Sequence, residues 1–503
     1  MAITTTEARL HDAIIVGAGF GGIGAAIALR RLGIDDIVIL DREDDLGGTW
    51  HVNRYPGLAV DIPSSTYSYS FAPNPSWSRL FAPGHELKAY ADEIAARYEL
   101  RRHMQFGVAV TAAHWNEPDH TWQVTTDDGR TLTARYLLSA TGYLSQPKLP
   151  EIDGIDQFAG EVIHTTRWRD DIPLAGKRIG IIGTGATAVQ LIPELAKQAR
   201  HLTVYQRTPI WVSAKLDFPI PRWTRRLFAR IPATQRIVRA IGTSILEVMM
   251  VTGVLQYRRL PAANWIGATA CRLNLRRAIR DPQLREQLTP RYSFGCKRPT
   301  FSNTYYPTLA KEHVTLETTP IARVDAHGIQ TQDGRRADLD VLILATGFNL
   351  WDATFPAFPI TGRDGCNLRA WWRANRYCAY EGVTIPGFPN LVSLNSPYSY
   401  SGLSYFTTIE YQMQHLARLI GAMRRSGHDT FEVTQSANQR FLERMTGLIG
   451  DSIFTRGNCA PARSYYFNEH GEATLLRPTS TLDAHRAARR FPLSDYRFSC
   501  SPG

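Results

Sequence analysis

The stretch AIIVGAGFGGIGAAIALRRLGIDDIVILDRE, residues 13–43, decides the fold of this chain. It begins with a short apolar run and passes through a glycine-rich turn into an Ala/Ile/Leu pattern with helical spacing. It ends in a second apolar run that stops at Asp41. A strand, a helix and a second strand in this order form a βαβ unit. The sequence therefore predicts an α/β fold with a Rossmann-like domain at its start.

The glycines of this stretch fit the pattern G-x-G-x-x-G at Gly17, Gly19 and Gly22, directly after the strand and before the helix. Gly17 permits the tight turn, Gly19 lets the backbone approach a pyrophosphate, and Gly22 lets the helix pack on the strand. The helix N-terminus attracts the anion. Asp41 follows Gly22 by 19 residues, where a carboxylate accepts a hydrogen bond from a ribose hydroxyl. We expect a dinucleotide site that suits FAD; the alternative is a purely structural turn.

A second stretch with the same order of features is RIGIIGTGATAVQLIPELAKQARHLTVYQRT, residues 178–208. Its glycine turn runs from Gly183 to Ala188, with alanine at the third glycine position, which this pattern permits. No acidic residue ends its second strand, and Arg207 stands there instead. Arginine at this place favours the 2′-phosphate of NADP over the hydroxyl of NAD. We expect an NADPH site; the alternative is that Arg207 is a solvated surface residue.

Two further strands, 136–142 (YLLSATG) and 341–348 (VLILATGF), share the triplet Ala-Thr-Gly and follow similar polar hairpins. They predict that the second Rossmann-like domain is inserted into the first. Residues 209–290 break the βαβ pattern and are rich in Arg, Leu, Ile and Ala, which predicts a helical subdomain. The expected boundaries are 1–150 for the first part of the FAD domain, 151–208 and 291–345 for the NADP domain, 209–290 for the helical subdomain, and 346–503 for the second part of the FAD domain with a C-terminal closing region.

Two dinucleotide sites in one chain indicate electron transfer from one nucleotide to the other. This leaves disulfide reductases, simple flavin reductases and monooxygenases open. The six cysteines include no C-x-x-C pair, which disfavours the first class and a zinc site. We expect free thiols, a reducing cytoplasmic compartment and no bound metal. Residues 1–12 lack the apolar core of a signal peptide.

Three further segments carry a resemblance to a known family. Phe158, Gly160, His164 and Trp168 form F-x-G-x-x-x-H-x-x-x-W just before the second glycine turn. Residues 47–50 (GGTW) precede 55–57 (YPG) and Asp61, and 292–298 reads YSFGCKR. Together these segments resemble the Baeyer–Villiger monooxygenases, the ketone-oxidising branch of the class B flavin monooxygenases. In this branch Pro or Asp usually follows the Trp, whereas Arg169 follows it here.

The resemblance implies an activity. NADPH would reduce FAD, the reduced flavin would bind dioxygen as a flavin peroxide, and the peroxide would attack a small-molecule ketone to give an ester or lactone. The alternatives are a flavin monooxygenase acting on sulfur or nitrogen, and an uncoupled NADPH oxidase or redox-binding flavoprotein.

The resemblance also implies site residues. Arg298 would be the catalytic cation, with Asp61 beside it and near the nicotinamide. The phenylalanine, glycine, histidine and tryptophan of the fingerprint would lie on the loop that joins the nucleotide domains. The expected cofactor-binding residues are Gly17, Gly19, Gly22, Asp41, Gly48, Thr49, Trp50, Asp61, Tyr67 and Val110 on the FAD side, and Gly183, Thr184, Gly185, Ala186, Thr187, Ala188, Val189, Gln206, Arg207, Lys297 and Arg298 on the NADP side.

The net charge and the apolar segments of the chain indicate which kinds of partner it could bind. The chain has 503 residues, with 57 Lys and Arg against 46 Asp and Glu, a net charge of +11. This excess fits anionic ligands but is too dilute to indicate nucleic acid. A basic amphipathic segment, 222–230, precedes the apolar run 241–255, which is too short to span a bilayer. The favoured interpretation is a helical cap with a solvated arginine face, and the alternative is a peripheral membrane contact. We expect a monomer or a weak homo-oligomer.

Two segments in the C-terminal part of the sequence are expected to form the substrate side of the site. The aromatic and small residues 395–406 are expected to line an apolar pocket. Many members of the family carry a tryptophan over NADP near a late asparagine. Ile453 and Phe454 occupy the matching place before Asn458, so the segment 457–477 is expected to close the site differently.

Overall fold

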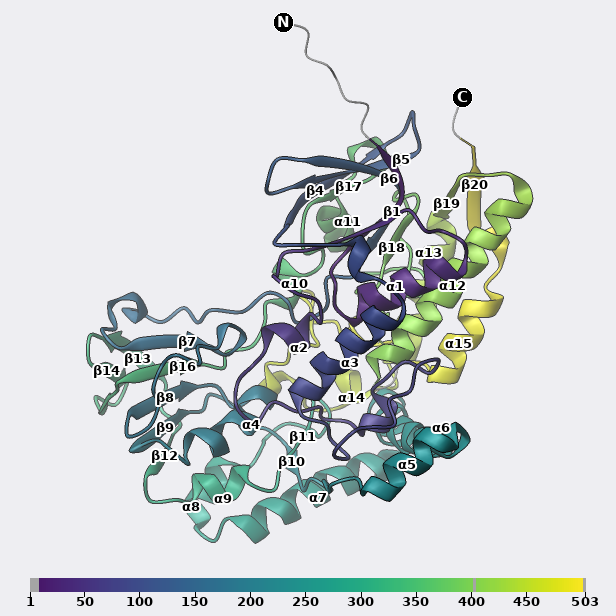
Figure 1. Cartoon of the computed structure of the whole chain (residues 1–503). Helices are drawn as coiled ribbons and strands as arrows, with labels where there is room; N and C mark the ends of the chain where they lie inside the picture. Colours follow the sequence, from purple (N-terminus) through teal and green to yellow (C-terminus); the bar gives the residue numbers. More distant parts are fainter. Residues whose placement is uncertain (1–8, 401–403, 501–503) are drawn as a thin grey trace, which may run out of the picture.

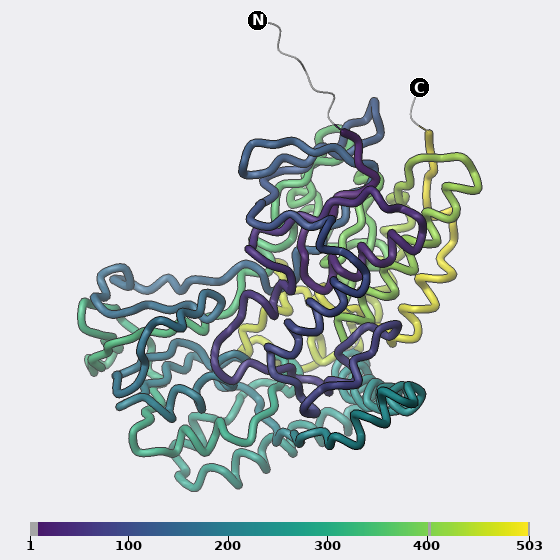
Figure 2. The backbone as a smooth tube through the Cα atoms, viewed as in Figure 1, coloured from purple at the N-terminus to yellow at the C-terminus, as the bar shows by residue number. Residues whose placement is uncertain are grey.

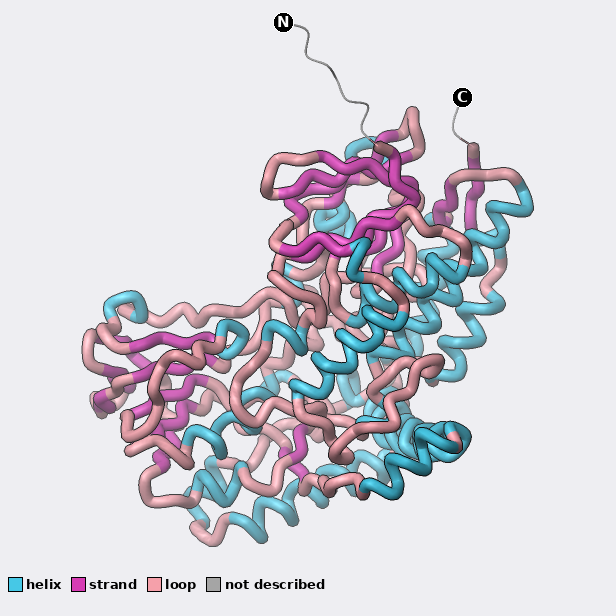
Figure 3. Tube along the Cα trace, in the orientation of Figure 1, coloured by secondary structure: helices cyan, strands magenta, loops and turns pink. Residues whose placement is uncertain are grey.

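The structure is a computed structural model that describes residues 9–400 and 404–500. Its strands gather in two separate groups, and helices cover both (Figures 1 and 3). Each group centres on parallel strands joined by a helix, as the two βαβ stretches predicted. The α/β class with two Rossmann-like sheets is therefore confirmed.

The first sheet has β1 in its interior, parallel to β2 on one side and to β6 on the other. Ala13 and Ile15 of β1 face one hydrophobic core, whereas Ile14 and Val16 face another. Both faces of the strand are thus buried, which explains its uninterrupted apolar run. The strand order is β17-β4-β5-β6-β1-β2-β3, with β18 also paired to β6. The strands are β1 (Leu10–Val16), β2 (Ile37–Asp41), β3 (Met104–Phe106), β4 (Val110–Asn116), β5 (Thr121–Thr126), β6 (Thr131–Ser139), β17 (Ile360–Thr361) and β18 (Leu391–Ser393).

The second sheet is entirely parallel and has the order β12-β9-β8-β16-β7. A small antiparallel sheet, β13-β14-β15, packs against one of its faces through Val324 and Ile329. The strands are β7 (Glu161–His164), β8 (Arg178–Ile182), β9 (His201–Tyr205), β12 (Val314–Glu317), β13 (Ile321–Asp325), β14 (Gly328–Thr331), β15 (Arg336–Asp338) and β16 (Val341–Leu344). Two short sheets remain: β10 (Val212–Ser213) with β11 (Thr300–Phe301), and β19 (Thr430–Val433) with β20 (Tyr496–Ser499).

The chain leaves the first sheet after β6, builds the whole second sheet, and then returns (Figure 2). The two connecting segments run side by side. Lys148 N–H donates to the carbonyl of Gly347 at 2.8 Å, and Asn349 N–H donates to that of Gln146 at 2.9 Å. Both segments follow an Ala-Thr-Gly triplet, so the repeated triplet marks the places where the chain departs and returns.

Helices cover the sheets and form the lower edge of the molecule in Figure 1. On the first sheet, α1 packs between the later helices α3 and α12. The helices are α1 (Phe20–Arg31), α2 (Thr49–Val52), α3 (Gly84–Arg97), α4 (Ala186–Leu195), α5 (Arg222–Arg230), α6 (Pro232–Leu246), the π-helical η5 (Glu247–Leu255), α7 (Pro261–Ala278), α8 (Pro282–Gln287), α9 (Tyr305–Leu309), α10 (Leu350–Ala353), α11 (Leu368–Ala374), α12 (Tyr405–Ser426), α13 (Gln435–Ile449), α14 (Ile453–Arg456) and α15 (Thr481–Arg490).

The stretch α5–α8 is helical, as the loss of the βαβ pattern indicated. The apolar helix within it is longer than the sequence pattern predicted. Because α6 continues into η5 without a break, the two together form one helix from Pro232 to Leu255, a length of 24 residues. By length and composition alone, this helix is apolar enough to cross a membrane.

Candidate active site

The first glycine turn has the shape that a dinucleotide needs. A Cβ at Gly17, whose φ is +110°, would lie 2.5 Å from the carbonyl oxygen of Ala140. A Cβ at Gly22 would lie 1.8 Å from the carbonyl oxygen of Gly17. At Gly19, by contrast, nothing comes closer than 3.5 Å to that position. Two glycines are thus required for backbone packing, and the third leaves the N-terminus of α1 open to an anion.

Asp41 lies at the end of β2, beside this turn. Its carboxylate accepts hydrogen bonds from Ala18 N–H at 2.6 Å and Glu43 N–H at 3.0 Å. Burial raises the pKa of Asp41, and these bonds oppose the increase. The carboxylate is therefore held at the edge of the turn. Val108 N–H donates to the carbonyl of Asp41 at 3.0 Å. Strand β4 begins two residues later at Val110, so Val110 lies near the same end of β2.

A second loop meets the glycine turn from the other side. Gly48, with φ of +53°, caps α2, and a Cβ there would lie 3.0 Å from the Cα of Gly19. Thr49 and Trp50 begin the helix. The indole N–H of Trp50 donates to the hydroxyl of Tyr67 at 3.3 Å, and the two rings meet edge to face. The GGTW segment thus stands where a cofactor bound at Gly19 would pass.

The second glycine turn repeats the geometry of the first. Gly183 has φ of +117°, and a Cβ there would lie 2.4 Å from the carbonyl oxygen of Ala345. At Gly185, the N-cap of α4, a Cβ would meet no atom within 4 Å. Thr184 donates to the carbonyl of Thr208 at 2.9 Å. The remaining predicted residues of this turn, Ala186, Thr187, Ala188 and Val189, form the first turn of α4. Room for a second dinucleotide therefore exists at the N-terminus of α4.

Three cations gather beyond this turn. Burial and the nearby charge of Arg207 lower the pKa of Lys297 to about 8. Burial and the nearby charge of Arg463 lower the pKa of Arg207 in turn. Like charges held this close favour an anion between them. The buried Gln206 next to Arg207 donates to the carbonyl of Gln287 at 2.8 Å, while its own side-chain oxygen has no partner among the described residues.

Asp61 and Arg298 form a two-pronged ion pair. Arg298 Nε donates to one carboxylate oxygen of Asp61 at 2.8 Å, and Nη2 donates to the other at 2.9 Å. Burial opposes the charge of Arg298, but the carboxylate outweighs it, so the pKa of the guanidinium lies well above its usual value. The side chains are 23% and 32% exposed for Arg298 and Asp61, so the pair remains reachable from outside. Within the pair, the guanidinium of Arg298 is a permanent cation whose direction the carboxylate fixes.

The ion pair lies beside the second glycine turn. Asp61 lines a recess together with Ala186 and Val189 of α4. On the same connecting loop, Tyr55 donates from its hydroxyl to Gln190 of α4 at 3.1 Å. The structure thus brings together Asp61 and Arg298, which are 237 positions apart, next to the second glycine turn.

The four fingerprint residues are parts of the protein interior. Phe158 and Trp168 are 8% and 5% exposed and belong to two different cores. A Cβ at Gly160 would lie 2.5 Å from the carbonyl oxygen of Asp340. His164, the last residue of β7, pairs its Nδ1 with Thr166 Oγ1 at 2.8 Å, and its buried Nε2 has no partner among the described residues. Burial lowers the pKa of His164, so the ring is neutral at pH 7.

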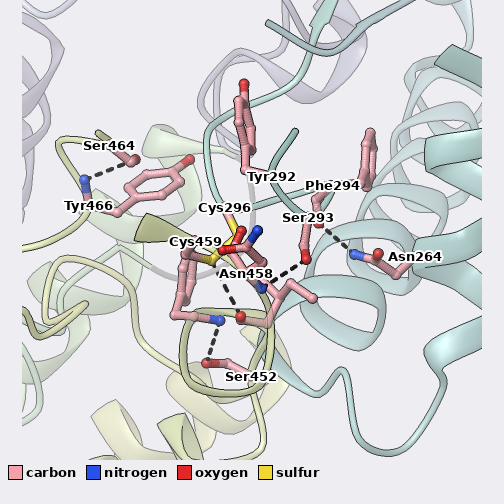
Figure 4. The surroundings of a disulfide bond; sticks show 12 residues. Asn264, Tyr292, Ser293, Phe294, Cys296, Ser452, Asn458, Cys459, Ser464 and Tyr466 are labelled. Atoms are coloured by element: carbon pink, nitrogen blue, oxygen red, sulfur yellow. Dashed lines mark hydrogen bonds between the residues drawn. A yellow bond between two sulfur atoms is a disulfide. The ribbon is translucent and has the colours of Figure 1, made fainter. Parts of the chain in front are cut away.

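A disulfide ties the C-terminal region to the segment before Arg298. It joins Cys296 and Cys459 (Figure 4). Ser293 N–H donates to the carbonyl of Asn458 at 3.0 Å, and Asn458 N–H donates to Ser293 Oγ at 3.0 Å. The expectation of free thiols is wrong for this pair, because a spacing of 163 residues carries no signal in the sequence. The other four cysteines are unpaired.

Phe454, at the place of the family's tryptophan, is 7% exposed and packs against Tyr466 with 5.4 Å between ring centroids. It therefore belongs to the interior of the closing region. Tyr465 and Tyr466 of this region lie near Arg298, as does Tyr400 of the aromatic run 395–406.

The aromatic run 395–406 reaches the first glycine turn. Tyr405 Oη donates to Asn395 at 2.7 Å, and a Cβ at Gly21 would lie 2.9 Å from that hydroxyl. Tyr143 packs edge to face on Tyr400 and Tyr405. Residues 401–403 of this run lie outside the described part of the chain.

Comparison with known proteins supplies the family. A family model described as pyridine nucleotide-disulphide oxidoreductase matches residues 14–254. A Baeyer–Villiger monooxygenase of Streptomyces coelicolor is 36% identical over 494 residues, covering 97% of this chain and 93% of that protein. One of Pseudomonas aeruginosa is 35% identical and covers 99% of this chain and 93% of that protein. This chain belongs to the Baeyer–Villiger monooxygenases.

Solved structures agree with this assignment. Cyclohexanone monooxygenase from Rhodococcus sp. Phi1, bound to NADP+, superposes with a TM-score of 0.86 at 28% identity, covering 98% of this chain and all of that one. A steroid monooxygenase bound to NADP has the same TM-score at 29% identity and the same coverage. A third relative, OTEMO in complex with FAD and NADP, has a TM-score of 0.85 at 29% identity, covering 97% of this chain and 99% of that one. The cofactors of this monooxygenase are FAD and NADPH.

Three features of the site were missed by the sequence analysis. Lys215 lines the recess beside Asp61, and burial lowers its pKa while Asp217 raises it. Arg463 adds the third cation, from the region whose contacts the family pattern did not cover. The disulfide is the third feature. No local motif surrounds Lys215 or Arg463, so only the fold brings them to the site. Among the described residues, no cluster of His, Cys, Asp or Glu could hold a metal ion.

Proposed function

We propose that the Asp61–Arg298 pair is the catalytic centre of this Baeyer–Villiger monooxygenase, which inserts one oxygen atom of dioxygen beside a ketone carbonyl to give an ester or lactone. The observation that carries the proposal is the two-pronged pair at 2.8 and 2.9 Å, placed next to the second glycine turn and ringed by tyrosines. Within this pair, Arg298 would supply a cation of fixed direction beside the second cofactor cradle.

The residues around the two turns fit the cofactors. We propose that Gly17–Gly22, Asp41, Gly48–Trp50 and Tyr67 hold FAD, with Val110 at its edge. Gly183–Val189, Gln206, Arg207 and Lys297 would hold NADPH, with the two cations on its 2′-phosphate. The open positions at Gly19 and Gly185 support this assignment, because each leaves a helix N-terminus accessible to a phosphate. When bound, the flavin accepts hydride from NADPH and activates dioxygen.

The role of Arg298 follows from its charge. Attack of an oxygen nucleophile on a ketone places negative charge on the carbonyl oxygen, and a fixed guanidinium stabilises that charge in the transition state. Asp61 accepts hydrogen bonds from two of the five N–H donors of Arg298, which fixes the direction of the guanidinium. The carboxylate of Asp61 also raises the pKa of Arg298, which keeps the guanidinium charged. Asp61 is therefore proposed as the residue that orients the catalytic cation.

The substrate is proposed to be an apolar ketone. The tyrosine cluster of Tyr143, Tyr400 and Tyr405 lies beside the first glycine turn and offers aromatic faces rather than charges. Two of the solved relatives named above are, by their names, a cyclohexanone monooxygenase and a steroid monooxygenase, and cyclohexanone is an apolar ketone.

We also propose the domain boundaries 1–150, 151–208 with 291–345, 209–290 and 346–503. Support comes from the position of the crossing segments near Lys148 and Gly347.

The remaining proposals are a cytoplasmic location, where NADPH is supplied, and a monomer or weak homo-oligomer.

Product analysis tests the function. The purified protein, loaded with FAD, is given NADPH and air with a panel of cyclic, aryl and long-chain ketones and one aryl sulfide. We expect products that are one oxygen heavier and carry an ester or lactone group. Sulfoxide formation with no ester would favour the heteroatom alternative. Consumption of NADPH with hydrogen peroxide as the only product would favour the uncoupled oxidase.

A further inference from the structure

The helical edge formed by α5, α6, η5 and α7 carries an unusual amount of exposed apolar surface. Nineteen large apolar side chains are exposed in the described part of the chain, and fourteen of them fall between Leu216 and Leu273. Trp223 on α5 is 68% exposed and Trp265 on α7 is 65% exposed. Figure 1 places these helices along the lower edge of the molecule. This concentration marks an interaction surface, which we call the apolar edge.

The exposed side chains of α6 follow helical spacing. Ile237, Ile241 and Ile245 recur every four residues and are 60%, 57% and 55% exposed. Val248, three residues further on, is 52% exposed. Residues three and four apart lie on one side of a helix. One side of α6 and η5 is therefore a continuous apolar stripe, and only 17% of the most apolar window of this helix is buried inside the protein. The solvated arginine face expected for 222–230 lies on α5, so the stripe on α6 and η5 is a separate feature.

The opposite side of the same helix is fixed to the protein. Gln235 donates to the carbonyl of Asn74 at 2.7 Å, and Arg239 donates to that of Ser68 at 2.7 Å. Glu247 accepts from the N–H and the hydroxyl of Thr481, both at 2.7 Å. Because the helix is held along its length, it cannot leave the protein to cross a bilayer. It can only present its stripe from the surface.

The charge of the apolar edge is strongly positive. Residues 215–280 contain thirteen Lys and Arg but only two acidic residues, so their formal charge of +11 equals that of the whole chain. Arg222, Arg226 and Arg230 are exposed and recur every four residues along α5.

From these observations we propose that the apolar edge docks the enzyme on the surface of an anionic lipid bilayer. Apolar side chains on one face of a helix with arginines beside them bind in the plane of a membrane interface, where the chains enter the acyl boundary and the cations meet lipid phosphates. A second copy of this chain is disfavoured as the occupant, because two edges of equal positive charge repel each other. Docking would place the enzyme where apolar ketones accumulate, a consequence that rests on the proposed function.

Vesicle sedimentation with the FAD-loaded enzyme tests the proposal. The vesicles are phosphatidylcholine alone, or an equal mixture of phosphatidylcholine and phosphatidylglycerol. We expect the enzyme to sediment with the mixed vesicles and to be released by high salt, because salt screens charge attraction. Failure to bind mixed vesicles, or equal binding to both kinds, would overturn the proposal. This measurement needs no substrate, so it is independent of the catalytic assignment.

Two sets of variants separate the apolar and ionic contributions. The triple substitution Ile237→Ser, Ile241→Ser and Ile245→Ser is expected to weaken binding by more than about tenfold, because it removes three large apolar side chains from the stripe. Each of Arg222→Gln, Arg226→Gln and Arg230→Gln is expected to weaken binding about fivefold. The matched control is Leu10→Ser, Leu144→Ser and Leu149→Ser, which removes exposed apolar side chains outside the edge and should leave binding unchanged.

A second measurement protects the test against loss of fold. Lipids with brominated acyl chains quench tryptophan that enters the acyl boundary, and we expect this quenching to fall in Trp223→Phe with Trp265→Phe. Unchanged quenching in that variant would contradict the proposal. So would a dimer in size-exclusion chromatography that dissociates in the isoleucine variant, since the edge would then join two copies.

Discussion

Arg298 is held so that its charge is permanent, and the carboxylate of Asp61 fixes its direction. Asp61 takes two of its five N–H donors, so a lysine at this position could not keep the same geometry. The fixed direction matters because stabilisation of a developing negative charge depends on donors that are already in place.

Arg298→Ala is expected to lower the rate of ester formation on the order of a hundredfold or more, because the transition state loses its cation. Reduction of FAD by NADPH should continue, since hydride transfer creates no carbonyl oxyanion. Stopped-flow reduction and product analysis on the same variant measure both steps. Arg298→Lys should restore little. The control is Arg291→Ala in the same segment, an arginine whose side chain is 81% exposed. Ester at near wild-type yield per NADPH in the alanine variant would refute the assignment.

If Lys297 binds the 2′-phosphate as proposed, the nucleotide preference is expected to depend on pH. The pKa of about 8 for Lys297 means that it is a cation below pH 8 and neutral above it. The attraction for the 2′-phosphate is therefore present at low pH and lost as the pH rises through 8. We expect kcat/KM for NADPH to fall roughly tenfold or more across this range, the value of one charge-assisted hydrogen bond. The value for NADH should stay level.

Two variants check the source of that pH dependence. Lys297→Arg should abolish the fall, because arginine stays charged. Arg207→Ala should raise the KM for NADPH but not for NADH. It should also move the inflection to higher pH, since Arg207 is one cause of the lowered pKa of Lys297. Equal losses for both nucleotides would remove the 2′-phosphate assignment.

At the scale of elements, the fingerprint segment 158–168 contains strand β7 and the short turn that follows it. His164 ends β7, next to Leu344 of β16, and its ring accepts a hydrogen bond from Thr166 N–H at 3.3 Å. The histidine thus shapes the start of the following turn without touching either glycine turn.

His164→Ala is expected to leave FAD binding intact and to lower oxygenation, because the turn loses the hydrogen bond that sets its path. His164→Asn should recover part of the activity, since an amide oxygen can accept from the same N–H. The measurement is ester yield per NADPH beside the flavin content of each purified variant. A His164→Ala protein that fails to fold or to retain FAD would show that the residue serves only the core.

The disulfide joins two elements that the chain order keeps apart. It closes a loop of 163 residues between the segment before Arg298 and the closing region. By the chain-entropy estimate, a loop longer than 100 residues stabilises the folded state by up to about 5 kcal/mol. A reducing agent is therefore expected to lower the melting temperature of the enzyme.

Thermal unfolding with and without dithiothreitol measures this effect. The variant Cys296→Ser with Cys459→Ser should melt at the lower temperature under both conditions. The matched control, Cys366→Ser with Cys500→Ser, changes two unpaired cysteines and should respond to the reductant as the wild type does. A wild-type melting temperature that ignores the reductant would contradict the expectation.

At the scale of the whole molecule, the C-terminal region is part of the first domain's interior and not an appendage. Arg477 and Glu381 form an ion pair at 2.6 Å whose side chains are 1% and 9% exposed. Such a pair contributes little net stability, but breaking it leaves one charge buried and unpaired.

Arg477→Met alone is therefore expected to lower the free energy of unfolding by about 3–5 kcal/mol. The double variant Arg477→Met with Glu381→Gln should lose less than the single one, because neither side chain then carries an unpaired charge. Urea titrations followed by circular dichroism provide the values. A double variant that loses the sum of both single losses would show that the two residues act independently.

The sequence by itself determined the two Rossmann-like units, their insertion and the two glycine cradles. These features depend on local rules: apolar periods of strand and helix, and positions where only glycine fits, as the close approaches at Gly17 and Gly183 show. The family pattern added Asp61, Lys297 and Arg298, because their spacing within short segments is distinctive.

Only the tertiary structure decided which distant side chains meet. The pairing of Cys296 with Cys459, the approach of Arg463 to Arg207, and the place of Lys215 beside Asp61 join segments whose separation in the chain carries no periodic signal. The exposure of the α6 stripe is of the same kind. The sequence of an apolar helix is the same whether the helix is buried under another part of the protein or exposed to water. The surrounding fold therefore decides that the isoleucines of α6 face outward.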